Sequence, residues 1–203
     1  RLVTIEDSGE AAELADVKFN ILYPIDNAII NPEFIPLADT FRIKHEVPKV
    51  IKERVDNILV TQGGSDTYGF TPEILRALYK LLPNITVNVV IGPNFTHYKE
   101  LNEVLADSPR EFNIIKNKSD LADLMLQADL AISAGGNTMF ELCCLGVPSV
   151  IVCAELFEFD LFSVNIKFHF IFIFSGDYLP RNNNFFYMIF FNRFHEVGVC
   201  NFS

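Results

Sequence analysis

The chain has 203 residues, half of them hydrophobic, and a formal net charge of −10 at pH 7. This length suits one ordinary domain, or one domain with pieces of another, and the composition excludes a chain that is disordered as a whole. The acidic balance argues against nucleic acid and anionic membrane partners, because phosphate backbones are bound by clustered Lys and Arg. It remains compatible with a nucleoside diphosphate held by backbone amides.

The sequence opens on Arg1 and a strand-like LVTI run, without the pattern of a secretory signal, so we expect a cytoplasmic protein. Because no initiator methionine is present, we expect a piece of a longer protein. The cysteines are expected to be core thiols, because the adjacent pair Cys143-Cys144 on a predicted helix points in different directions. No Cys or His pattern has metal-ligand spacing, so neither a metal nor another cofactor is expected.

Residues 1–56 differ in character from the rest of the chain. Short strands are predicted at 2–5 and 17–21, on either side of a helix at 9–14. A proline-spaced segment follows, and we expect a helix over 47–56. These residues cannot complete a hydrophobic core of their own, so we interpret them as the end of a preceding domain and a connector.

From residue 57 to 152, short apolar runs alternate with segments of helical periodicity. Strands are predicted at 58–61, 87–91, 112–115, 130–133 and 148–152, and helices at 72–82, 96–106, 138–145 and around 121–125, the last starting at Ser119 or Asp120. Thr71 is the expected cap of the first helix, and Gly146 ends the last. This alternation predicts right-handed β-α-β units, and hence an α/β, Rossmann-like parallel sheet with helices on both faces.

Two glycine pairs, Gly63-Gly64 and Gly135-Gly136, follow predicted strands. They should lie at the carboxyl edge of the sheet, where such folds bind ligands. The second pair opens a helix that Asn137 or Thr138 can cap, and the free amides of that helix favour a phosphate. Glu141 follows, where its carboxylate could accept from two ribose hydroxyls. The pattern predicts a nucleotide site, although neither pair belongs to a dinucleotide-binding or P-loop motif.

Residues 156–203 hold 13 of the chain's 20 phenylalanines. The run 167–174 has high β-propensity and is too short to span a membrane. We interpret 159–203 as an atypical tail produced by a frameshift or read-through. A genuine aromatic C-terminal lobe is the alternative.

Three segments resemble a known family: ILVTQGGSDTYGFTPEILRAL (58–78), VNVVIGPNF (87–95) and ADLAISAGGNTMFELCCLGVPSVIVCAE (128–155). Their order and spacing are similar to the C-terminal domain of the SpsG type. That family includes the pseudaminic-acid-pathway hydrolase, which cleaves UDP from UDP-2,4-diacetamido-2,4,6-trideoxy-L-altrose. A more distant resemblance is to the peptidoglycan N-acetylglucosaminyltransferase, which has the two-lobed glycosyltransferase-B fold.

The resemblance implies a domain organisation. Residues 1–56 would be the end of the N-terminal lobe and a connector, and 57–158 the nucleotide-binding C-terminal lobe. It also implies residue roles: Gly135, Gly136, Asn137 and Thr138 for the diphosphate, Glu141 for the ribose, Ile115, Lys116 and Asn117 along the uracil, and Gly63, Gly64, Ser65 and Asp66 lining the cleft. Simpler alternatives stay open, namely a tight turn at Gly63-Gly64, a solvated Glu141 and a helix-capping Asp66.

The activity implied by the resemblance is that of a UDP-sugar hydrolase of bacterial surface-glycan biosynthesis, with this chain as its UDP-binding half. The family's base is a histidine in a G-x-G-H loop of the first lobe, and none of His45, His97, His169 and His195 has that context. No catalytic residue is therefore predicted, and the chain alone is expected to be inactive. A glycosyltransferase of the same fold and a nucleotide-binding module without catalysis are the alternatives. The sequence predicts neither the sugar nor the oligomeric state.

Overall fold

In the computed structural model of the chain, the described residues are 1–22, 25–81, 85–153 and 170–174. The strands are β1 (Val3–Ile5), β2 (Val17–Phe19), β3 (Asn57–Thr61), β4 (Thr86–Ile91), β5 (Asn113–Lys116), β6 (Leu130–Ala134), β7 (Ser149–Cys153) and β8 (Phe170–Phe174). The α-helices are α1 (Glu10–Glu13), α2 (Asp39–Lys44), α3 (Phe70–Leu81), α4 (Tyr98–Asp107), α5 (Ala122–Gln127) and α6 (Asn137–Cys144), and a 3-10 turn covers Pro32–Phe34.

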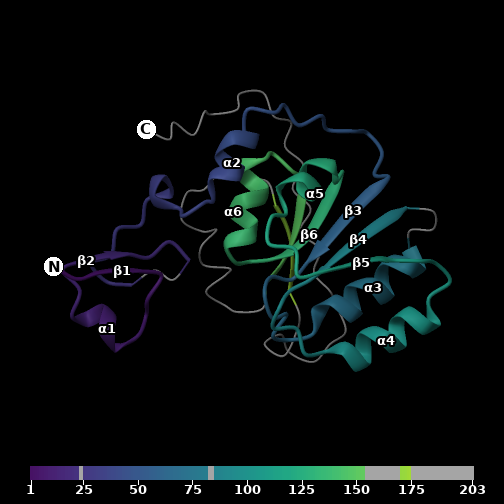
Figure 1. Ribbon diagram of the computed structural model, residues 1–203, viewed down its shortest axis with the longest axis horizontal. Coiled ribbons are helices and arrows are strands. Elements are labelled where there is room, and N and C mark those ends of the chain that lie inside the picture. Colours follow the sequence, from purple (N-terminus) through teal and green to yellow (C-terminus); the bar gives the residue numbers. More distant parts are fainter. Residues whose placement is uncertain (23–24, 82–84, 154–169, 175–203) are drawn as a thin grey trace.

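The main sheet has six parallel strands in the order β5-β4-β3-β6-β7-β8 (Figure 1). Strands β3 and β6 are neighbours, with Ile58 opposite Leu130 and Thr61 opposite Ser133. This is the strand order of doubly wound nucleotide-binding folds. The predicted α/β, Rossmann-like fold is confirmed, and each of the five predicted strands lies within one residue of its observed bounds.

Alternate residues along the strands belong to two hydrophobic clusters, one on each face of the sheet. Ile58 and Val60 pack with Leu75 and Leu78 of α3 on one face. Leu59, between them, packs on the other face with residues of α2, α5 and α6. Both faces are therefore covered by helices, as Figure 1 shows, which explains why the strands are almost continuously apolar.

Two features of the connector and the first long helix differ from the sequence predictions. Residues 47–56 form no helix, and the helix of this region is α2, earlier in the chain. Pro48 and the β-branched residues around it disfavour a helix there. Helix α3 begins at Phe70, and its cap is Asp66 rather than Thr71, because both carboxylate oxygens of Asp66 accept first-turn amides.

The first strands form a separate two-stranded parallel sheet, β1-β2. The chain that follows β2 leads to the main domain, where Ile21 and Leu22 are buried against Met139 and Phe140 of α6. Part of residues 1–56 is thus packed on the larger domain. Within the part of the chain that the structure describes, no helix combines the length and apolar character needed to cross a membrane.

The strand-forming run of the tail is described only at β8. This strand pairs in parallel with β7, from Ser149 opposite Phe170 to Cys153 opposite Phe174. The rest of the tail, together with His169, His195, Cys200 and the predicted helix end at Leu82, lies outside the described residues.

Candidate functional site

The carboxyl ends of β3 and β6 meet at the point where the strand order reverses. From β3 the chain continues outward to β4 and β5, and from β6 it continues in the other direction to β7 and β8. The loops after β3 and β6 therefore leave the sheet on opposite faces, at the place where doubly wound folds bind ligands. The fold brings both sequence-predicted glycine pairs, Gly63-Gly64 and Gly135-Gly136, to this point.

The Gly63-Gly64 loop is held against the turn after β4. Gly63 has a positive φ of 73°, which favours glycine, and the amide of Asn94 donates to the Gly64 carbonyl at 2.9 Å. A Cβ at Gly92 would lie 2.5 Å from the Gly63 oxygen and still closer to that of Gly64. The loop therefore has a structural role as a tight turn, whatever it binds.

Asp66 caps helix α3. Its Oδ1 accepts from the amide of Phe70 at 2.8 Å and its Oδ2 from the amide of Thr71 at 2.9 Å. Asp66 is buried with φ at 46°, a left-handed conformation that Asp tolerates better than most residues. Ser65 faces its own loop, with its hydroxyl 3.0 Å from that of Thr67. Of the alternatives for Asp66, the structure shows capping.

The Gly135-Gly136 loop leads directly into α6. Gly136 is the N-cap residue, with extended backbone and no side-chain cap. The expected capping by Asn137 or Thr138 is wrong, because Asn137 is already the first helical residue and no side chain turns back to the amides. A Cβ at Gly136 would meet no atom within 4 Å. The start of α6 therefore combines uncapped first-turn amides with open space, which suits an anion.

Glu141 lies on α6, one turn into the helix, and is half-buried. Burial and the negative charge of Asp120 raise the pKa of Glu141 to about 7. Asp120 itself is held ionised, because the amide of Ala122 (3.0 Å from Oδ1) and the hydroxyl of Thr40 (3.1 Å from Oδ2) lower its pKa. Glu141 is thus not a freely solvated carboxylate. Near neutral pH both its protonated and its ionised form are populated.

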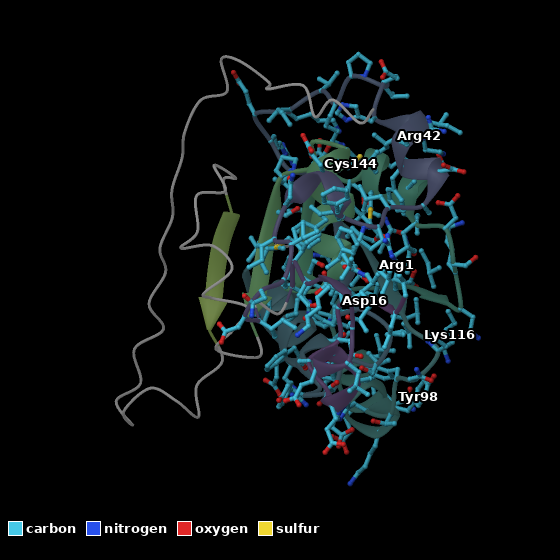
Figure 2. All side chains as sticks on the ribbon, turned by 90° about the vertical axis from the view of Figure 1, so that its left-hand side faces the viewer. Arg1, Asp16, Arg42, Tyr98, Lys116 and Cys144 are labelled. Atoms are coloured by element: carbon cyan, nitrogen blue, oxygen red, sulfur yellow. The ribbon has the colours of Figure 1, made fainter. Side chains whose placement is uncertain are left out.

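The three residues expected to lie along the uracil are at the end of β5, which is an edge strand of the sheet. Ile115 is half-buried, while Lys116 and Asn117 are exposed. The amide of Asn117 donates to the Ile91 carbonyl, and its φ is 53°. The Lys116 ammonium lies 5.0 Å from the ring centre of Tyr98, and the two residues lie on the same side of the molecule in Figure 2. In the strand order, these residues are separated from the glycine loop of β6 by β4 and β3.

Sequence reasoning missed two residues of this region. Gln62, directly after β3, is 5% exposed, and its amide nitrogen donates to the Ile132 carbonyl of β6 at 3.4 Å. The hydroxyl of Thr40, on α2, donates a hydrogen bond to Asp120, which lies 80 residues later in the chain. A polar residue between an apolar strand and a glycine pair is a signal that could have indicated Gln62. Nothing local to Thr40 indicates its partner.

The opposite, amino-terminal edge of the sheet carries a different polar cluster. The Lys49 ammonium donates to the carbonyls of Leu126 and Ala128, at 2.5 Å each. Asp129 accepts from Lys52 and from the amides of Asp56 and Asn57. A cavity of about 230 Å³ beside them is lined by the connector and the end of α5. These contacts attach the connector to the sheet at the edge that faces away from the switch point.

The histidines of the described chain have structural partners. The Nδ1 of His45 lies 2.6 Å from the Cys144 carbonyl at the end of α6. The ring of His97 lies against Gly69, and its Nε2 is 3.3 Å from the Thr67 carbonyl. The thiol of Cys144 donates to the Phe41 carbonyl, whereas Cys143 packs in the cluster around Ile21. The two cysteines therefore have different neighbours. In the described part of the chain, no group of three or more His, Cys, Asp or Glu could hold a metal ion.

The parallel sheet and its strand order define a protein of the Rossmann-like α/β class, in which ligands bind at the strand switch point. The chain belongs to the family described as "Protein of unknown function (DUF354)", whose model matches residues 49–170.

Two curated relatives and one solved structure are similar to it. The uncharacterized protein MJ1062 of Methanocaldococcus jannaschii is 35% identical over 125 residues, which is 60% of this chain and 26% of that protein. The spore coat polysaccharide biosynthesis protein SpsG of Bacillus subtilis is 28% identical over 160 residues, 72% of this chain and 46% of SpsG. The crystal structure of Acinetobacter baumannii MurG matches with a TM-score of 0.45 and 20% identity, over 75% of this chain and 44% of that chain. The chain thus spans less than half the length of either relative.

Proposed function

We propose that this chain is the nucleotide-binding part of an enzyme that processes a UDP-sugar in polysaccharide biosynthesis, with residues 57–158 as the second lobe of a glycosyltransferase-B fold. One observation carries the proposal. The two glycine loops and the uncapped start of α6 converge at the carboxyl ends of β3 and β6. Backbone amides at such a place can bind a diphosphate without clustered lysines, which fits a chain of net charge −10.

The residues of the second loop take the nucleotide in this proposal. The amides of Gly136, Asn137 and Thr138 bind the diphosphate, and the ionised carboxylate of Glu141 accepts from the ribose hydroxyls. The half-buried position of Glu141 strengthens such hydrogen bonds, because water competes less for the carboxylate. The strand end at Ile115, Lys116 and Asn117 lies along the uracil.

The similarity to SpsG supports the proposed role in polysaccharide biosynthesis. That relative is named for spore coat polysaccharide biosynthesis and aligns with 72% of this chain. The segments that resemble the SpsG type include both glycine loops and Glu141. Within this class we propose a hydrolase that cleaves UDP from a diacetamido-trideoxy sugar. A glycosyltransferase of the same fold and a module that binds nucleotide without catalysis are the alternatives.

Hydrolysis needs an activated water and a stabilised leaving diphosphate. The loop amides at the start of α6 would supply the second requirement. His45 and His97 are engaged with backbone carbonyls at Cys144 and Thr67, so we assign the base to neither of them. Glu141 is not assigned as the base either, because the proposal already gives it the role of binding the ribose hydroxyls.

Calorimetry with UDP tests the nucleotide site. Replacing Glu141 by Ala should weaken UDP binding by about 1–3 kcal/mol, the range for charge-assisted hydrogen bonds. Glu103→Ala, an exposed carboxylate on α4, is the matched control and should leave the affinity unchanged. Equal UDP affinities for the wild type and Glu141→Ala would remove Glu141 from the site.

Product analysis separates the three activities. Because the chain alone is expected to be inactive, the assay uses this chain together with the first lobe of the enzyme. The protein is incubated with a UDP-linked diacetamido-trideoxy sugar, and free UDP and free sugar are measured. Release of both in water supports the hydrolase. Release of UDP only when an acceptor is added supports the transferase, and tight binding without release supports the non-catalytic module.

A further inference from the structure

Gln62 holds a buried polar atom that has no partner among the described residues. The side chain is 5% exposed at the carboxyl end of β3. Its Nε2 donates across to the Ile132 carbonyl of the neighbouring strand β6, whereas its Oε1 is buried without a hydrogen-bond donor. Such an atom loses the hydrogen bonds of water without replacement, so buried acceptors of this kind call for an explanation.

The orientation of the amide follows from its neighbour. Turning the amide over would place Oε1 against the Ile132 carbonyl, which would bring two acceptors together. The nitrogen therefore faces β6, and the group without a partner is an acceptor that points away from the Ile132 oxygen. Whatever satisfies Oε1 must supply an N–H or an O–H.

The position of Gln62 limits what that donor can be. Gly63-Gly64 follow it directly, and Ile132 lies on the strand that leads into Gly135-Gly136, so the amide lies across the strand switch point. A Cβ at Gly63, Gly64 or Gly136 would meet no atom within 4 Å, which leaves both loops open to a ligand. A diphosphate has only acceptors to offer at neutral pH, whereas a sugar has hydroxyl and acetamido N–H donors.

We propose that the Gln62 carbonyl oxygen accepts a hydrogen bond from the sugar of the bound sugar nucleotide, at a hydroxyl or acetamido N–H next to the diphosphate. Gln62 then distinguishes a sugar nucleotide from the bare nucleotide, because UDP alone leaves Oε1 without a partner. A site that is built to bind a donor discriminates strongly against ligands that lack it. The inference rests on the proposed function, since it needs a nucleotide at the switch point.

The test compares UDP with UDP-N-acetylglucosamine and UDP-glucose by calorimetry, on the wild type and on Gln62→Met. Methionine keeps the length and the apolar contacts but has no comparable acceptor. We expect Gln62→Met to weaken the binding of at least one sugar nucleotide about five- to tenfold, as for the loss of one neutral hydrogen bond, and to leave UDP unchanged. The sugar that is affected shows whether the donor is a hydroxyl or the acetamido N–H.

Gln127→Met is the matched control, because it makes the same change on an exposed side chain at the amino-terminal edge of the sheet. It should change neither affinity. A second measurement uses the wild type alone, so it does not depend on the folding of the variant. The side-chain amide resonances of Gln62 should shift in NMR spectra when the affected sugar nucleotide is added, and stay in place with UDP.

The outcomes separate this inference from the proposed function. If the wild type binds neither UDP nor a sugar nucleotide, the proposed function fails and this inference fails with it. If the wild type binds both, but Gln62→Met binds every ligand as the wild type does and the Gln62 resonances do not move, only this inference is overturned. A raised melting temperature of Gln62→Met with unchanged affinities would assign Oε1 a purely structural role.

Discussion

Asp120, in the loop after β5, repels the carboxylate of Glu141 on α6 across the carboxyl edge of the sheet. Burial of Glu141 is the larger cause and this repulsion the smaller one, and together they raise the pKa of Glu141 to about 7. Asp120 cannot relieve the repulsion easily by taking up a proton, because Ala122 and Thr40 hydrogen-bond to its charged form. The proposed ribose contact therefore has a charge that changes near neutral pH.

The affinity for a UDP-sugar should rise with pH through 7. Ribose hydroxyls donate to the ionised carboxylate, and the ionised fraction of Glu141 increases about tenfold between pH 6 and pH 8 for a pKa of about 7. We expect affinity to rise by up to that factor, as measured by calorimetry. A UDP-sugar is preferable to UDP, because a terminal phosphate has its own pKa near 6. Glu141→Gln should bind with no such pH dependence, and a wild type with the same flat profile would contradict the role of Glu141.

The same group predicts a pH-dependent stability difference. The folded pKa of Glu141, about 7, is above the ordinary value of 4.5, so the folded protein retains a proton that the unfolded chain releases. The stability contribution is complete below pH 4.5 and is lost as the pH rises to about 7. Relative to the wild type, Glu141→Gln should gain about 1–2 kcal/mol between these limits, less than the full shift implies because the side chain is only half-buried. Urea unfolding at pH 4.5 and pH 8 measures the gain, and an equal difference at both values would contradict it.

Removing the cap of α3 should destabilise the fold. Asp66→Ala leaves the amides of Phe70 and Thr71 without acceptors and places Ala at a positive φ, so we expect a loss of about 1–2 kcal/mol in urea unfolding. Asp66→Asn keeps one acceptor and tolerates the conformation, so it should cost less. Asp107→Ala, at the exposed end of α4, is the control. A midpoint of Asp66→Ala equal to that of the control would rule out the capping role.

Replacement by alanine should lower stability at Gly92, whereas at Gly136 it should mainly weaken UDP binding. Gly92→Ala would force a Cβ against the carbonyls of Gly63 and Gly64, so we expect a loss of about 1–3 kcal/mol in stability. Gly136→Ala meets no atom, and it should cost no more than about 0.5 kcal/mol while weakening UDP binding, since its Cβ enters the space proposed for the diphosphate. Thermal unfolding and calorimetry on both variants check this. A Gly136→Ala protein that binds UDP normally would move the diphosphate away from this loop.

The sequence patterns that predicted the fold correctly are local ones. Ile58, Leu59 and Val60 are consecutive and apolar because each faces a covered side of a parallel sheet, and such a run is visible without the structure. Gly63 is visible in the sequence too, and its positive φ in the turn after β3 favours glycine. The error at 47–56 overlooked a local signal, because Pro48 and the β-branched residues around it disfavour a helix. The error at Thr71 arose because Asp66, four residues before the start of α3, supplies the cap.

The sequence by itself determined the alternation of strands and helices, the parallel sheet and the place of the glycine loops along the chain. Only the tertiary structure decided which loops meet, because the strand order puts β3 beside β6 although two strands and three helices separate them in the chain. The partners of Gln62 and of Glu141 follow from that order. Burial of Gln62 Oε1 and the repulsion between Asp120 and Glu141 depend on distances through space, which the spacing of residues along the chain does not encode.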